Sequence, residues 1–216
     1  MKRILALVAA TTLLSGAAFA QSVSEKTGVN SVLGIAPATQ DFVKEAATSD
    51  MLEIQAAQIA QQKGNASEQK FAAQMIADHT KTTNDIKGLI ASGAVKAELP
   101  TALDSSSQKK LDDLKAAKPE YFAATYDPMQ VSAHKDAVSL FERYAKGGDN
   151  AKLKDWAGKT LPALQHHLDM AQQMNDARRN ATVGSSTGGP ASSMDTSRSS
   201  NAMGGGSTTA PAGSAK

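Results

Sequence analysis

The fold class is decided by the stretch FAAQMIADHTKTTNDIKGLI, residues 71–90. Its apolar side chains recur every three or four residues, which is the period of an amphipathic helix rather than of a strand. The seam consists of Ala72, Ile76, His79, Thr83, Ile86 and Ile90. A titratable side chain, His79, therefore stands on a face that should be buried, where it costs free energy unless a partner satisfies it.

The same period continues on both sides of this stretch and predicts four long helices. The first covers about residues 40–62 and the second about 66–91, where Asn65 and Glu68 have the spacing of a capping box. The third carries His134, and the fourth, which we expect Asp149 to cap, carries His167. The link between the first two helices is short, so we expect them to lie antiparallel.

Two interpretations stay open at Pro128. Either Asp127 caps a new helix with Pro128 in its first turn, or one longer helix is kinked at Pro128. Residues 94–126 contain a predicted short helix at about 106–117 and connect the second helix to the third. The predicted fold is therefore all-α: a ferritin-like four-helix bundle with a long crossover between helices 2 and 3, plus a disordered C-terminal tail.

The two ends of the chain differ from its middle. Lys2 and Arg3, an apolar run at 4–14 and small residues at 18–20 are typical of a secretory signal peptide. The end of the chain is almost entirely Gly, Ser, Thr, Ala, Pro and Asn, which cannot form a packed core. We predict a signal peptide at 1–20, a flexible leader at 21–39, a bundle domain at 40–178 and a disordered tail at 179–216. The protein should be periplasmic or secreted.

Composition excludes several classes of partner. The chain has 23 basic and 21 acidic residues, and removal of Lys2 and Arg3 leaves 21 of each, a net charge of zero. This balance argues against nucleic acid and anionic lipid as partners. No segment after the signal is apolar enough to cross a membrane. Cysteine is absent, so the fold has no disulfide. Which envelope or self-association partner it has is left open.

The candidate site is one acidic residue and three histidines on the seams of the four helices: Glu53, His79, His134 and His167. Three imidazoles and a carboxylate suit zinc, copper, iron or nickel far better than calcium. We hypothesise that they bind one transition-metal ion, with Asp78 and Gln130 orienting the imidazoles. A ferritin-type di-iron centre is disfavoured, because the chain contains no Glu-x-x-His pair.

Other interpretations of these residues stay open. Without a metal, Glu53 would accept hydrogen bonds from His79 or His134 in a buried network that fixes helix register. Met75 and Met170 stand near the histidines in sequence and would favour copper(I), although methionine at helical spacing is commonly core packing. His166 points away from the seam, and we expect it to be exposed.

Several segments resemble a known family. They are Leu52-Glu53-Ile54, the run from Phe71 to His79 that ends Met-Ile-Ala-Asp-His, Tyr126 with Gln130 and His134, and Leu161-Pro162-Ala163-Leu164-Gln165-His166-His167-Leu168. In this order they resemble the bacterial exported family called domain of unknown function 4142, which is grouped with ferritin-like folds. The resemblance implies a helical bundle and export, and it implies no established reaction.

The function predicted from the sequence is correspondingly broad. We expect an exported helical-bundle protein that binds one metal ion in its core and serves metal handling or envelope stress protection. The alternative is a metal-free structural or interaction module of the cell envelope. The chain has no Gly-rich phosphate loop and no Gly-x-Ser-x-Gly elbow. We therefore favour a role without catalysis, with a metal-dependent redox enzyme as a further alternative.

Overall fold

The computed structural model describes residues 29–186, with the exposure of side chains described for 31–182. Within this range the chain forms helices and no strand, which confirms the all-α class. The helices are α2 (Val29–Val32), α3 (Thr39–Lys63), α4 (Ala66–Ala91), α5 (Ser105–Ala116), α6 (Pro119–Gly147) and α7 (Ala151–Ser186). The predicted signal peptide, the first part of the leader and most of the predicted tail lie outside the described residues.

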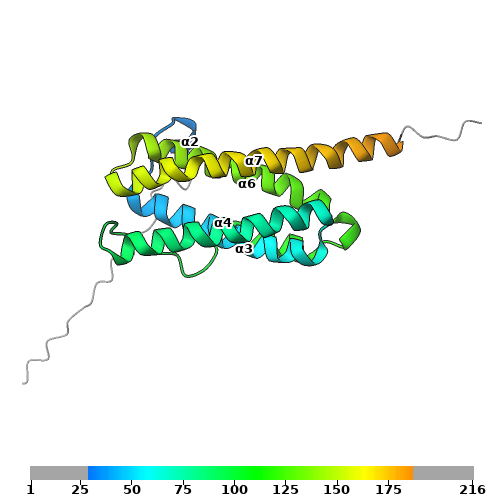
Figure 1. Cartoon of the computed structure of the whole chain (residues 1–216), viewed down its shortest axis with the longest axis horizontal. Coiled ribbons are helices and arrows are strands. Elements are labelled where there is room, and N and C mark those ends of the chain that lie inside the picture. Colours follow the sequence, from blue (N-terminus) through cyan, green and yellow to red (C-terminus); the bar gives the residue numbers. More distant parts are fainter. Residues whose placement is uncertain (1–28, 187–216) are drawn as a thin grey trace, which may run out of the picture.

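The long helices form two hairpins that pack on each other. Helix α3 packs along α4, and α6 packs along α7. The two hairpins meet through α3 against α6 and α4 against α7, so that each long helix touches two others (Figure 1). The short helix α5 lies on α3 and α6. Within the described residues no helix has the length and apolar character that a membrane span requires.

The turn between α3 and α4 follows the predicted local chemistry. The Asn65 side chain accepts hydrogen bonds from the backbone N–H groups of Ser67 and Glu68. In return the backbone N–H of Asn65 donates to the Glu68 carboxylate at 2.8 Å, which completes the capping box. At the other end of α4, Gly93 has a φ of 74°, a left-handed conformation that favours glycine.

The predicted helix start at Asp127 is wrong. Helix α6 begins at Pro119 and continues through Pro128, so the alternative of one longer helix is the correct one. Pro119 occupies the first turn, where its missing N–H has no cost. Asp127 lies inside the helix and is 1% exposed. Its burial leaves its carboxylate facing the protein interior instead of a helix end.

The end points of the last helix also differ from the prediction. Asn150, and not Asp149, accepts the hydrogen bond from the Leu153 N–H that caps the start of α7. The Asp149 carboxylate instead accepts from the Thr39 hydroxyl at 2.6 Å and the Tyr144 hydroxyl at 3.2 Å. At its far end α7 continues to Ser186, past the expected domain limit at residue 178.

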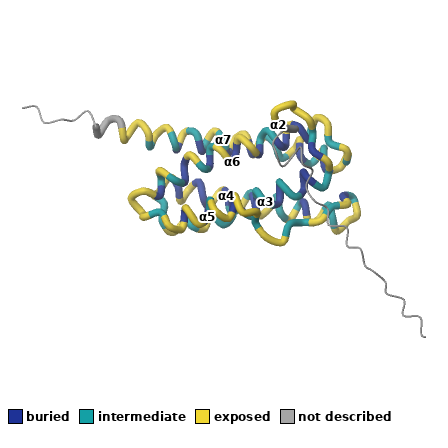
Figure 2. The backbone as a smooth tube through the Cα atoms, turned by 180° about the vertical axis from the view of Figure 1, so that it is seen from behind, coloured by how far each residue is buried: buried dark blue, intermediate teal, exposed yellow. Residues whose placement is uncertain are grey.

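The buried side chains form two apolar clusters. In Figure 2 the buried positions of the backbone, in dark blue, lie mainly on the inner sides of the long helices. One cluster is built around Phe71, Met75, Phe122 and Tyr126. The other contains Phe42, whose ring stacks on Tyr144 at 4.0 Å between centroids. Along each long helix the site residue stands between members of the two clusters: Glu53, His79, His134 and His167. The core therefore has a polar layer at mid-height.

Candidate metal centre

Three histidines from three helices converge in the polar layer. His79 comes from α4, His134 from α6 and His167 from α7, and each is at most 2% exposed. Their ring centroids lie 5.5–5.9 Å apart. One ring nitrogen of each lies within 4.8 Å of those of the other two. The three histidines predicted on the seams are thus brought together.

One nitrogen of each imidazole is held by a partner. His79 Nδ1 donates to Asp50 Oδ1 at 2.8 Å, and His167 Nε2 donates to Asp78 Oδ2 at 2.8 Å. His134 Nδ1 donates to the backbone carbonyl of Gln130 at 2.9 Å. Carboxylate and carbonyl oxygens only accept, so a neutral ring must carry its proton on the nitrogen that faces them.

The second nitrogen of each ring is buried and has no hydrogen-bond partner among the described residues. These atoms are His79 Nε2, His134 Nε2 and His167 Nδ1. Because the partnered nitrogens carry the protons, these second nitrogens present lone pairs when the rings are neutral. A metal-ligating histidine has the same arrangement, with one nitrogen fixed by an outer acceptor and the other free to bind the ion.

Glu53 on α3 supplies the acidic residue of the site. It is 1% exposed, and neither carboxylate oxygen has a hydrogen-bond partner in the described part of the chain. Its charge acts on the pKa of both His79 and His134, so it lies within electrostatic range of them. Its oxygens are not among the atoms that meet within 4.8 Å. The expected hydrogen bonds from His79 or His134 to Glu53 are not formed.

The sequence interpretation missed Asp50. This residue of α3 is 5% exposed and holds His79 in place. It also accepts hydrogen bonds from the hydroxyls of Thr82 at 2.8 Å and Thr83 at 3.0 Å. Its position three residues before Glu53 was the available signal, because residues three apart share a helix face.

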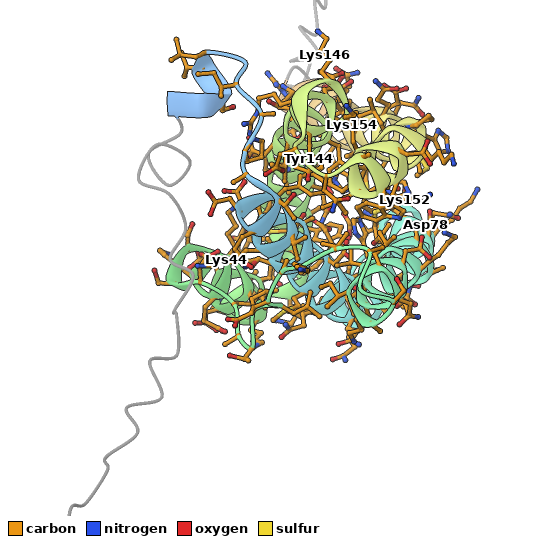
Figure 3. The ribbon with its side chains drawn as sticks, turned by 90° about the vertical axis from the view of Figure 1, so that its left-hand side faces the viewer. Lys44, Asp78, Tyr144, Lys146, Lys152 and Lys154 are labelled. Carbon is orange, nitrogen blue, oxygen red and sulfur yellow. The ribbon has the colours of Figure 1, made fainter. Side chains whose placement is uncertain are left out.

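The two predicted outer partners act in different ways. Asp78 lies where α4 and α7 adjoin (Figure 3) and fixes His167 through its carboxylate, as expected. Gln130 fixes His134 through its backbone carbonyl, and its side-chain amide is fully buried without a partner among the described residues. The exposed His166 also agrees with expectation.

The three imidazoles differ in their pKa values. Burial lowers the pKa of His167 to about 4, even though the hydrogen bond to Asp78 acts in the opposite direction. Burial also lowers the pKa of His134. Burial acts on His79 in the same sense, but its hydrogen bond to Asp50 and the Asp50 charge outweigh that effect and raise the pKa. Two of the three rings are thus held in the neutral form that binds metal.

The two methionines belong to the apolar packing. Met75 is fully buried in the cluster around Phe71 and Tyr126, and Met170 is partly buried against the same cluster. Their packing fits the role of core side chains. The candidate donors are therefore the imidazole nitrogens, with the Glu53 carboxylate as the predicted acidic donor.

Comparison with known proteins places the chain in a family. The model of the family described as Domain of unknown function (DUF4142) matches residues 24–174, which is most of the chain. The chain therefore belongs to this family, and the resemblance seen in the sequence is confirmed. No curated protein and no solved structure matches the chain.

Proposed function

We propose that this member of the DUF4142 family is an exported protein that binds one transition-metal ion in its core. The ligands are His79, His134, His167 and Glu53, one from each long helix. The scaffold is a four-helix bundle of the ferritin-like type, in which the segment between α4 and α6 is the long crossover. Export rests on the predicted signal at residues 1–20 and places the protein in the periplasm or outside the cell.

This proposal rests on the different surroundings of the two nitrogens in each imidazole ring. An outer oxygen holds one nitrogen, and the other nitrogen is buried without a partner. Buried polar atoms without partners are rare because each has lost its hydrogen bonds to water. Three such nitrogens and the two oxygens of Glu53 gather in one layer. One cation would satisfy all of them.

The three imidazoles need only a small closure around an ion. Two imidazole nitrogens on one ion, each about 2.1 Å from it, are at most about 4.2 Å apart. One ring nitrogen of each histidine already lies within 4.8 Å of those of the other two. Rotation of the rings about their hydrogen bonds would bring them into range. Imidazole and carboxylate suit zinc, copper, iron and nickel.

The role we propose is metal handling or envelope stress protection. Its support is the burial of the ligands, since groups at most 2% exposed shield an ion from competing chelators. This burial suits retention of the ion better than rapid exchange.

A metal-free structural or interaction module is the second candidate. It is favoured by the pairing of Asp50 with His79 and of Asp78 with His167, which tie α3 to α4 and α4 to α7 without any ion. It leaves both oxygens of Glu53 unsatisfied. We rank it second for that reason.

The test is metal analysis of the full chain purified without a polyhistidine tag, which would itself bind metal. The protein is supplied in turn with zinc, copper, iron and nickel salts and separated from free ion. We expect one ion per chain, and loss of that ion in His134→Ala. His166→Ala is the matched control, because it removes an exposed imidazole next to the site.

Two results would decide against the proposal. One is a wild-type chain that retains none of these metals. The other is equal metal retention in His134→Ala and His166→Ala. A metal-free wild type that is strongly destabilised by His79→Ala would support the structural module.

A further inference from the structure

Besides the four proposed ligands, the core contains further buried polar groups without partners. The Tyr126 hydroxyl and both polar atoms of the Gln130 side-chain amide are buried and lack hydrogen-bond partners among the described residues. Both residues are 0% exposed. Tyr126, Gln130 and His134 follow one another at intervals of four along α6, so they share one face of the helix.

These groups lie beside the proposed ligands. The ring of Phe71 is 6.3 Å from the Tyr126 ring and 6.0 Å from the His134 ring, so one side chain bridges the two. Side chains in a helix lean toward its N-terminus. The His134 side chain therefore lies over the preceding turn, which contains Gln130. His134 Nδ1 in fact bonds to the Gln130 carbonyl. Gln130 thus stands one helical turn before His134.

A metal ion bound by Glu53 and the histidines would not satisfy these two residues. Neutral amides and phenols are poor ligands for such ions beside imidazole and carboxylate. Burial, with the charges of Glu53, Glu68 and Asp127, raises the pKa of Tyr126 well above its usual value. Its hydroxyl therefore keeps its proton and is a hydrogen-bond donor. The Gln130 amide supplies two more donor hydrogens and an acceptor.

We propose that the centre takes one small ligand besides the protein side chains, and that Gln130 and Tyr126 bind it by hydrogen bonds. This inference rests on the proposed metal function. The ligand belongs to the class of water and small anions of one to three heavy atoms, because the surrounding residues are fully buried. Such a ligand would contact the ion on the side of α6. A centre of this kind keeps a position open to exchange, as catalytic metal sites do.

Azide binding to the cobalt(II)-loaded full chain tests this inference. Cobalt(II) reports changes of its ligands through visible absorption bands, and azide is a three-atom anion. We expect a saturable spectral change in wild type. Tyr126→Phe and Gln130→Met each remove hydrogen-bonding groups at nearly constant volume. Each should weaken azide binding about tenfold, measured per bound cobalt ion. Tyr121→Phe and Gln165→Met, at exposed positions of α6 and α7, are the matched controls.

The outcomes separate this inference from the proposed function. Stoichiometric cobalt without any spectral response to azide overturns the inference and leaves the metal function standing. Azide affinity that is the same in wild type, Tyr126→Phe and Gln130→Met also overturns it. A wild-type chain that binds no cobalt overturns both this inference and the proposed metal function. Circular dichroism of each variant establishes that the helices are intact, and the wild-type titration decides the matter even if one variant does not fold.

Discussion

Asp50 and His79 face each other across α3 and α4, with 2.8 Å between the carboxylate Oδ1 and the imidazole Nδ1. The same carboxylate accepts from the hydroxyls of Thr82 and Thr83. Its oxygens are thus occupied by three donors from one helix. Such a carboxylate fixes both the orientation of the ring and the nitrogen that carries its proton.

The first prediction concerns this carboxylate. Asp50→Asn should weaken metal binding about 10- to 100-fold, because an amide orients the ring less firmly and does not increase its basicity. Competition with a chromogenic chelator measures the affinity. Asp112→Asn, an exposed change on α5, should leave it unaltered. Equal affinities in the two variants would show that Asp50 has no part in the metal site.

The second prediction is an acid sensitivity of the metal-free protein that depends on His167. Its pKa is about 4 in the folded chain, against 6.5 for a free imidazole. Between these values the unfolded state binds a proton that the folded state does not, so stability falls as the pH drops through this window. His167→Gln should flatten the decline by roughly 1 kcal/mol per pH unit.

Urea unfolding at several pH values from 4 to 7, with a chelator present, measures this effect. His166→Gln removes the neighbouring exposed imidazole and should follow the wild-type curve. The prediction fails if the curve of His167→Gln also runs parallel to that of wild type.

The third prediction concerns Asp127, whose titration should make the metal-free protein less stable as the pH rises. Burial, with the charge of Glu68, raises the pKa of Asp127 from 3.8 to about 7, although Arg178 opposes this shift. As the pH rises from about 4 to 7, the unfolded state releases this proton before the folded state does, and stability declines. Asp127→Asn cannot ionise, so its stability relative to wild type should increase over the same window.

Thermal unfolding of the two proteins across this range, each with its metal removed, provides the comparison. Asp155→Asn on the exposed side of α7 is the control. A stability difference between Asp127→Asn and wild type that stays constant with pH would contradict the titration of Asp127.

The histidines could be predicted as site residues from the sequence because each stands on an apolar seam with a period of three to four residues. The sequence did not establish that they share one level. Counting about 1.5 Å per residue from the nearest predicted loop places Glu53 roughly 14 Å and His167 roughly 25 Å along their helices. In the structure the two loops lie at opposite ends of the bundle, so these depths are counted from opposite directions. Only tertiary packing sets how the levels compare.

Asp127 and Asp149 show a second limit of the sequence. Both precede residues that suit a helix start, so local chemistry alone made them plausible caps. The structure buries Asp127 within α6 and pairs Asp149 with Thr39 of another helix. Packing between helices outweighed the local preference in both places.

The last prediction concerns Lys63, which ties the end of α3 to the end of α5. Its ammonium group donates to the backbone carbonyls of Leu114, Lys115 and Ala117, the last at 2.9 Å. These carbonyls belong to the last turn of α5 and to its C-cap, Ala117, where no partner within the helix is available to them. A positive charge also interacts favourably with this end of the helix dipole.

Lys63→Met keeps the aliphatic stem and removes all three bonds. We expect a loss of about 1–3 kcal/mol and faster hydrogen exchange in residues 105–116, with the amides of α4 protected as before. Lys70→Met on the exposed face of α4 is the control. Because α5 packs on α3 and α6 and carries none of the proposed ligands, metal content should not change. Unaltered exchange in α5 would mean that its apolar residues Leu111 and Leu114, both fully buried, hold it in place without help from Lys63.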